Sequence, residues 1–82
     1  MSSEVLHVGD HLDGYRVEES KDTKNGHAWV FSKGNSAVMI EMSTNDYIDY
    51  MLSPYERERI LDQMRSDLYY SFRDKESKIW SR

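Results

Sequence analysis

The chain has 82 residues, with 11 lysines and arginines against 15 aspartates and glutamates, so its formal net charge is −4. This length allows one domain with a small core, and an aromatic content of 12% argues against disorder. The sequence contains no cysteine, no signal-peptide apolar stretch and no apolar run of the ~18 residues that span a membrane. We therefore expect a single cytoplasmic globular domain over residues 1–82, without disulfides, thiolate metal sites or a membrane segment.

The first segment, residues 1–12, carries a short apolar alternation that predicts an N-terminal arm or an edge strand. Side chains of the metal-ligating type gather in and just after this segment, at His7, Asp10, His11 and Asp13. Gly9 interrupts the group, and its spacing matches no known ligand pattern. We expect a polar loop with no metal and no cofactor.

Three segments, residues 14–20, 27–32 and 36–42, have the composition and alternation of β-strands. Gly34-Asn35 is typical of a two-residue hairpin turn between the second and third strands. This turn would place Phe31 opposite Val38 and Trp29 opposite Ile40. The core face of that hairpin would then present Trp29, Phe31, Val38, Ile40 and Met42, and the other face Ala28, Val30, Ala37, Met39 and Glu41.

The turn between the first two strands gives conflicting signals. Asn25-Gly26 is typical of a type I′ turn, but the register it implies places Glu18 and Ser20 beside Trp29 on the core face. Turning the apolar residues of the first strand to that face requires an extra residue, because side chains alternate along a strand. We expect a longer loop or a bulge within Lys21 to Gly26, at a mobile hairpin tip.

A short helix over residues 47–52 should follow the strands. The preceding run Ser43-Thr44-Asn45-Asp46 consists of residues that favour a helix N-terminus. We expect the aliphatic side of this helix to face the core through Ile48, Met51 and Leu52.

A long C-terminal helix begins at Ser53 and Pro54, where Glu56 completes a capping box. Apolar residues then recur at three- and four-residue steps and form a core-facing stripe of Ile60, Leu61, Met64, Leu68 and Phe72. Residues 73–82 are a charged tail or the end of this helix. The predicted fold is α+β: a three-stranded antiparallel β-meander, then a short helix and a long C-terminal helix packed on one sheet face.

Catalytic motifs with defined spacing are absent from the sequence, which has no G-x-S-x-G, no H-E-x-x-H and no phosphate-binding lysine loop. A domain with three strands and one long helix also has little room for a deep substrate pocket. The sequence therefore predicts no catalytic residues and a protein that is not an enzyme.

Aromatic and apolar side chains outside the core stripe predict a protein-binding surface, since Tyr and Trp bury a large area at a low entropy cost. The alternative is that these tyrosines surround a small core, with their hydroxyls in water, and bind no partner. Small size, acidic charge and the lack of a catalytic motif resemble the small inhibitory proteins that phages make against host or defence enzymes. That resemblance implies an inhibitor or adaptor of a larger protein, and a homodimer is the other way to cover such a surface. The candidate partner-binding residues are Val30, Met39, Tyr50, Tyr69, Tyr70 and Trp80.

Nucleic acid enters two further hypotheses. Carboxylates of the first half could imitate a phosphate backbone, through Asp10, Asp13, Glu18, Glu19, Asp22, Asp46 and Asp49. The alternative function is nucleic-acid binding by the C-terminal helix, through Arg57, Arg59, Arg65, Arg73, Lys75, Lys78, Tyr69, Tyr70 and Trp80. Interleaved acids cancel most of that positive charge, and the acidic first half repels phosphates. A protein partner therefore ranks above nucleic acid.

Overall fold

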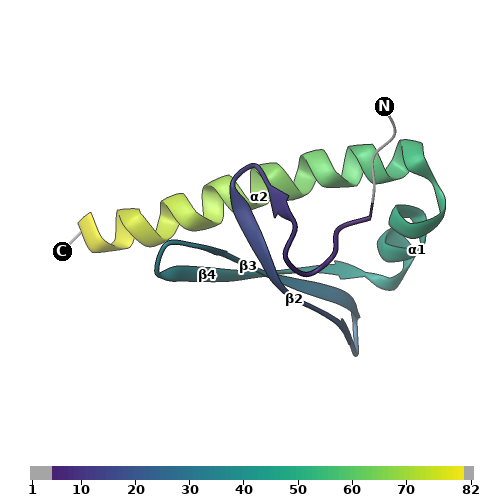
Figure 1. Ribbon diagram of the computed structural model, residues 1–82, viewed down its shortest axis with the longest axis horizontal. Coiled ribbons are helices and arrows are strands. Elements are labelled where there is room, and N and C mark those ends of the chain that lie inside the picture. Colours follow the sequence, from purple (N-terminus) through teal and green to yellow (C-terminus); the bar gives the residue numbers. More distant parts are fainter. Residues whose placement is uncertain (1–4, 81–82) are drawn as a thin grey trace.

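The computed structural model describes the backbone of residues 5–80 and the side chains of residues 5–73. One antiparallel sheet contains β1 (His11–Leu12), β2 (Tyr15–Thr23), β3 (Gly26–Lys33) and β4 (Ser36–Ser43), in that spatial order. Two helices follow, α1 (Thr44–Leu52) and α2 (Pro54–Trp80), and α2 runs across one face of the sheet (Figure 1). The predicted α+β class is confirmed, but the sheet has four strands rather than three.

The additional strand, β1, lies at the edge of the sheet and is only 2 residues long. Leu12 pairs with Tyr15 across a two-residue turn at Asp13 and Gly14. Both turn residues have a positive φ, 56° and 86°, which is the backbone geometry of tight hairpin turns. β1 lies within residues 1–12, where the sequence predicted an arm or an edge strand, but the apolar alternation behind that prediction precedes it.

The core lies between α2 and the sheet, where the sequence placed it. All five residues of the predicted α2 stripe are buried, and the expected β3–β4 register is confirmed by the pairs Phe31–Val38 and Trp29–Ile40. Trp29, Phe31 and Met42 are buried in the sheet, and Val38 and Ile40 pack against them. The two-residue turn and the helical period were therefore sufficient to predict the β3–β4 hairpin and the buried face of α2.

A β-bulge resolves the conflict in the β2–β3 hairpin. The register shifts between Val17 and Glu19, which makes Glu18 the extra residue. Val17 is therefore fully buried on the core face, even though the strand beyond the bulge has the opposite alternation.

The tip of that hairpin is a simple turn of Lys24 and Asn25, because Thr23 pairs directly with Gly26. The prediction of a longer loop or a bulge within Lys21 to Gly26 is wrong in this respect. The extra residue is inserted earlier in β2, where a surface glutamate can project without disturbing the core.

α1 turns its aromatic side to the core. Tyr50 is fully buried and Tyr47 is partly buried, whereas Ile48, Met51 and Leu52 are exposed. The prediction that these three aliphatic residues face inward is wrong. Flat rings on the sheet explain the choice, since Tyr47 stacks on the His27 ring with centroids 4.2 Å apart.

The corner between the helices is held by hydrogen bonds to backbone groups. Ser53 Oγ accepts the N–H of Glu56 at 3.2 Å, which is one half of the predicted capping box. The Ser53 N–H itself donates to the carbonyl oxygen of Asp49 rather than to the Glu56 side chain. Arg57 lies one turn further on and donates to the carbonyl oxygens of Tyr50 and Met51, at 2.7 and 2.9 Å. These bonds satisfy carbonyls at the C-terminal end of α1 that have no partner within the helix.

The substitution Gly26→Ala should be strongly destabilising. A Cβ atom at Gly26 would overlap the carbonyl oxygen of Met42 and neighbouring backbone atoms. These atoms cannot move away easily, because Gly26 pairs with Ser43 in the sheet. We expect a loss of more than about 2 kcal/mol in the free energy of unfolding, measured with urea.

Gly34→Asn is the matched control for this prediction. Gly34 has a φ of +62°, which asparagine tolerates, and no heavy atom lies within 4 Å of an added Cβ. This variant should lose less than about 1 kcal/mol. Equal losses at the two glycines would contradict the close approach of Gly26 to β4.

Candidate functional site

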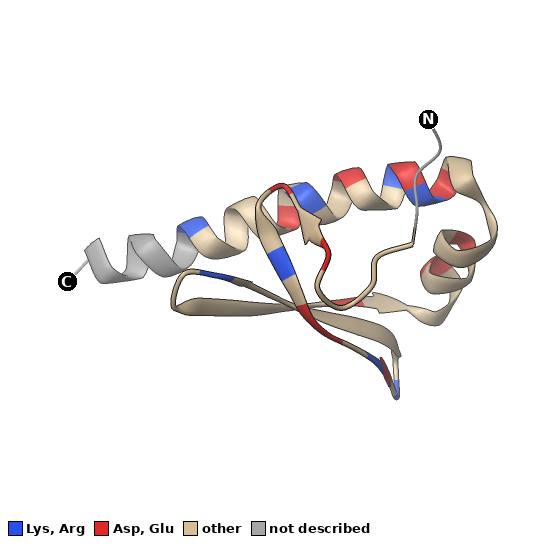
Figure 2. Cartoon of the chain, in the orientation of Figure 1, with Lys and Arg blue, Asp and Glu red and all other residues tan. Residues whose placement is uncertain are grey.

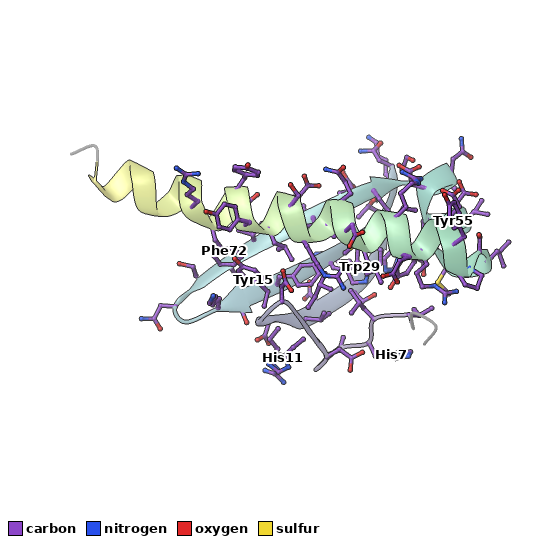
Figure 3. All side chains as sticks on the ribbon, turned by 90° about the horizontal axis from the view of Figure 1, so that it is seen from above. His7, His11, Tyr15, Trp29, Tyr55 and Phe72 are labelled. Carbon is purple, nitrogen blue, oxygen red and sulfur yellow. The ribbon has the colours of Figure 1, made fainter. Side chains whose placement is uncertain are left out.

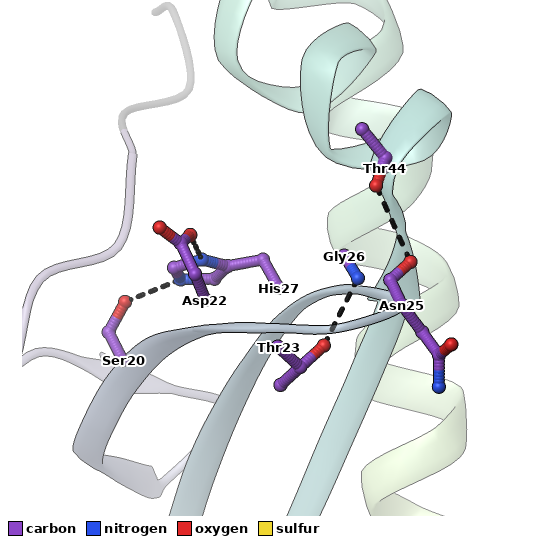
Figure 4. Close-up of polar contacts among 7 residues, drawn as sticks. All are labelled: Ser20, Asp22, Thr23, Asn25, Gly26, His27 and Thr44. Carbon is purple, nitrogen blue, oxygen red and sulfur yellow. Dashed lines mark hydrogen bonds and ion pairs between the residues drawn. The ribbon is translucent and has the colours of Figure 1, made fainter.

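A polar cluster is centred on the buried His27, on the sheet face that carries the core. Its Nε2 lies 2.8 Å from Ser20 Oγ, and its Nδ1 lies 2.9 Å from Asp22 Oδ1 (Figure 4). Asp22 is the direct cross-strand partner of His27, and Ser20 is opposite Trp29. The bulge at Glu18 sets this face, because it places the outer half of β2 in the register that brings Ser20 and Asp22 to the ring.

This connectivity, a hydroxyl on Nε2 and a carboxylate on Nδ1, is that of a serine hydrolase triad. Hydrolysis also needs oxyanion donors and a pocket that holds the acyl group at the hydroxyl. Two hollows among the described side chains, one beside Tyr15 and one beside Ile60, are lined by other residues. The Asp22 side chain is 88% exposed, so water competes for its carboxylate. We interpret the cluster as a means of giving both ring nitrogens of a buried histidine a partner.

The His27 ring also forms part of the surface on which α1 packs. It stacks on Tyr47 at 4.2 Å with an interplanar angle of 7°, and it meets Trp29 edge-on at 4.7 Å. Aromatic contacts of this kind add roughly 0.5–1.5 kcal/mol each to the burial of apolar area. The histidine is therefore part of the packing that orients α1.

Tyr50, which the sequence analysis assigned to the partner-binding surface, is fully buried, so that assignment is wrong. Its hydroxyl accepts the N–H of Leu6 at 2.7 Å, and its ring meets Trp29 edge-on at 5.3 Å. Burial raises the pKa of the Tyr50 hydroxyl above its ordinary value, against smaller opposing effects of the Leu6 N–H and Arg57. A tyrosine can be buried at this depth because a backbone group satisfies its hydroxyl.

The other predicted partner-binding residues lie in two separate places. Val30 and Met39 pair directly on the sheet face opposite the core, where Met39 is 55% exposed. Tyr69 and Tyr70 lie on α2, are 54% and 56% exposed, and pack edge to face with ring centroids 5.2 Å apart. The predicted exposure of Tyr70 is confirmed, Val30 is half-buried, and the fold does not join the two pairs. The side chain of Trp80 lies outside the described residues.

A third apolar surface, which the sequence analysis missed, lies where α1 meets α2. Leu52 is 78% exposed and Tyr55 is 79% exposed, and Figure 3 shows Tyr55 beside the end of α1. Ile48 and Leu52 are four residues apart and share one side of α1. We name this surface the apolar corner, and it consists of Ile48, Met51, Leu52 and Tyr55.

The signal for the apolar corner was present in the sequence but ambiguous. Tyr47 and Tyr50 are three residues apart and define an alternative inward stripe of α1. Choosing the aliphatic stripe placed Tyr50 outside and the corner inside. Both wrong placements have the same cause, because the predicted rotation of α1 about its axis was incorrect.

The acidic residues proposed as a nucleic-acid mimic do not form a regular row. Figure 2 shows them spread over the N-terminal segment, β2 and α1. Asp46 and Asp49 lie on α1. Each of the others has a hydrogen-bond or ion-pair partner: His7 for Asp10, Arg65 for Asp13, Arg16 for Glu18, Lys21 for Glu19 and His27 for Asp22.

The basic residues of α2 are largely engaged with oxygen atoms of the protein itself. Arg57 donates to α1 carbonyls, Arg59 pairs with Glu56 at 2.8 Å, and Arg65 pairs with Asp62 at 2.5 Å. Arg73 is exposed, and the side chains of Lys75 and Lys78 lie outside the described residues. The described part of the helix therefore presents alternating charges rather than a basic stripe.

Among residues 5–73, no group of three or more histidine, aspartate or glutamate side chains converges as a metal site. Asp10 instead closes its own turn, with Oδ2 accepting the N–H of His7 at 2.8 Å. Within the described part of the chain, no helix combines the length and apolarity needed to cross a bilayer.

Comparisons of the chain with protein-family models, curated proteins and solved structures give no match. The geometry of the described residues therefore carries the functional argument.

The substitution Tyr50→Phe should change the pH dependence of stability. The pKa of Tyr50 is raised in the folded state, so its neutral form contributes stability that is fully present below the unfolded pKa of about 10. That contribution is lost as the pH rises through the folded pKa. Above pH ~10 the wild type should therefore lose stability more steeply than Tyr50→Phe, which lacks the titrating hydroxyl. Urea unfolding at several pH values measures the difference.

At neutral pH the same variant should lose about 1 kcal/mol, because the Leu6 N–H loses its acceptor. Tyr69→Phe is the control, since its ring is exposed and should leave both the stability and its pH profile unchanged. Identical pH profiles for the wild type and Tyr50→Phe would contradict the role assigned to the buried hydroxyl.

The hydroxyl of Ser20 should show no nucleophilic activation. We expect a fluorophosphonate probe to label Ser20 no faster than Ser32, whose hydroxyl donates to Glu18 at 2.5 Å. Mass spectrometry of the labelled protein locates the adduct. Selective labelling of Ser20 that disappears in His27→Gln would show a working triad and overturn the structural interpretation of the cluster.

Proposed function

We propose that the protein is a binding module for another protein and acts as its inhibitor or adaptor. The observation that carries this proposal is the apolar corner, where large apolar side chains are exposed although the core is complete without them. Contiguous apolar surface on a small domain is a mark of an interaction site.

Binding at the apolar corner should gain free energy from apolar burial and lose little to conformational ordering. Burial of a leucine side chain such as Leu52 stabilises a complex by roughly 1.5–3 kcal/mol, and exposed tyrosines such as Tyr55 are frequent hot spots. The bonds from Arg57 to α1 and the cap at Ser53 hold the corner in place. Little conformational entropy is then lost on binding.

The surfaces predicted from sequence are weaker candidates for the centre of the contact. Val30 pairs with Glu19 of β2, a strand that carries the ion pairs of Arg16 with Glu18 and of Lys21 with Glu19, and Met39 lies one strand further away. An apolar pair beside exposed charges is typical of an ordinary sheet surface. Tyr69 and Tyr70 are larger, but they already cover part of each other.

The net charge of the chain and its resemblance to small phage inhibitors suggest the kind of partner. A net charge of −4 favours a partner with a basic surface. The likeness to small phage inhibitors suggests a host or defence enzyme, and the absence of cysteine agrees with action in the cytoplasm. Nucleic-acid binding through α2 receives less support, because its described arginines at positions 57, 59 and 65 are engaged within the protein.

The substitution Leu52→Glu should weaken binding to the partner by at least about tenfold, because a buried charge without a partner is costly. The partner is first captured from a lysate and identified, and calorimetry with the purified partner then gives the affinity. Val8→Glu is the matched control, since Val8 is also an exposed apolar residue, 59% exposed, but lies in the N-terminal segment. It should bind like the wild type.

Met39→Glu and Tyr70→Ala complete the series and locate the centre of the contact. A loss of affinity in either, with Leu52→Glu unaffected, would move the site away from the apolar corner. Wild-type affinity in all three folded variants would show that the proposal is wrong. Light scattering of the free protein tests the homodimer.

A further inference from the structure

The outer edge of β4 around Met39 and Glu41 has no strand neighbour among the described residues. β4 is 8 residues long and ends the sheet, so within the described residues it pairs with β3 alone. Lys33 and Ser36 close the two-residue turn, and hydrogen-bonded pairs alternate from that point along an antiparallel ladder. The backbone N–H and C=O groups of Met39 and Glu41 are therefore directed away from β3.

A groove runs along this edge, between β4 and one flank of α2, with a volume of about 210 Å³. Four consecutive residues of β4, 40–43, line it. Because successive side chains point to opposite faces of a sheet, a lining by consecutive residues means that the strand edge itself borders the groove. The α2 side consists of Arg59, Ile60, Gln63, Met64 and Asp67.

The groove combines an apolar floor with an acidic rim. Met42, Ile60 and Met64 are buried at its base. Glu41, Asp46 and Asp67 contribute carboxylates, whereas the lining includes one guanidinium, Arg59, which is already paired with Glu56 at 2.8 Å. Such a rim favours an occupant that carries lysine or arginine.

We propose that this groove binds an extended basic segment of the partner protein, which joins the edge of β4 as an additional strand. This inference rests on the proposed function and names the kind of segment that the module recognises. Main-chain hydrogen bonds to the free edge would supply affinity, and the acidic rim would select basic side chains at alternate positions.

A second copy of this chain fits the groove less well. The strand that would dock, β4, carries Glu41 as its only ionisable residue, so a β4–β4 pairing brings two acidic rims together. Like charges in direct opposition across a strand pair are destabilising. Charge complementarity therefore favours a basic partner.

One end of the groove lies near the junction of α1 and α2, where the apolar corner is also found. Tyr55 of the corner and Arg59 of the groove are four residues apart on α2 and so lie on one side of it. Asp46 of α1 and Arg59 of α2 both line the groove, so α1 lies near this end of it. A segment bound along β4 would reach the corner at Tyr55.

Synthetic peptides of about eight residues, the length of β4, test the inference by NMR titration of the labelled protein. In the first peptide lysine alternates with valine, in the second glutamate replaces lysine, and in the third proline replaces two central valines. The basic peptide should bind at least about tenfold more tightly than the acidic one, and the proline peptide should not bind, because it lacks strand donors. The amide shifts should centre on β4 and on Gln63.

The double variant Glu41→Lys with Asp67→Lys should lose at least about tenfold in affinity for the basic peptide. Glu19→Lys with Glu58→Lys is the matched control, since it changes the net charge equally at exposed positions outside the groove lining. It should bind the basic peptide far better than the groove variant does. Circular dichroism and melting curves confirm that both variants are folded.

Three results would overturn the inference. The first is a basic peptide that binds no better than the acidic one, or whose shifts map elsewhere. The second is a larger molecular mass of the free protein that the groove variant abolishes, because a second copy would then occupy the edge. The third is a groove variant that binds the captured partner normally while Leu52→Glu does not; the proposed function would then stand and the groove assignment alone would fail.

Discussion

The burial of Tyr50 is the interaction on which the arrangement of the helices depends. Its ring lies edge-on to Trp29 of β3 at 5.3 Å, and its hydroxyl accepts the N–H of Leu6 at 2.7 Å. Its carbonyl oxygen accepts a hydrogen bond from Arg57 of α2, also at 2.7 Å. The N-terminal segment, the sheet and both helices therefore meet at one residue. Because these contacts fix the rotation of α1 about its axis, they also decide which side of that helix faces water.

The exposed side of α1 is a direct consequence of this packing. The sheet offers the face of the His27 ring, on which Tyr47 stacks, and the Trp29 ring, which Tyr50 meets edge-on. Tyrosine rings contact these groups more favourably than branched aliphatic chains would. Leu52 is then left in water at the end of α1. An apolar residue so placed adds nothing to the core, so its contribution to stability comes only when another molecule covers it. The same geometry that completes the core creates the apolar corner.

The sequence predicted the parts of the fold that one local signal determines. The α2 stripe and the Gly34-Asn35 turn are each unambiguous, and the core around them formed as expected. Where two signals competed, as in the β2–β3 hairpin, the sequence did not determine the strand register. The bulge at Glu18 satisfies both a tight turn and a buried Val17, although neither signal alone locates it. The exposure of Tyr70 was predictable because it lies outside the stripe, whereas the groove joins β4 to α2 through contacts distant in sequence.

The outer edge of β4 also affects the solubility of the protein. A long apolar edge strand tends to pair with other copies of the same chain, and proteins commonly block such edges with charges or cover them. β4 has neither proline nor lysine, and its protection comes from Glu41 and from the α2 flank that carries Asp67. Acidic protection of this kind is selective, because it repels an identical edge and attracts a basic one. The carboxylates that oppose pairing with an identical edge are therefore the ones that would attract a basic partner strand.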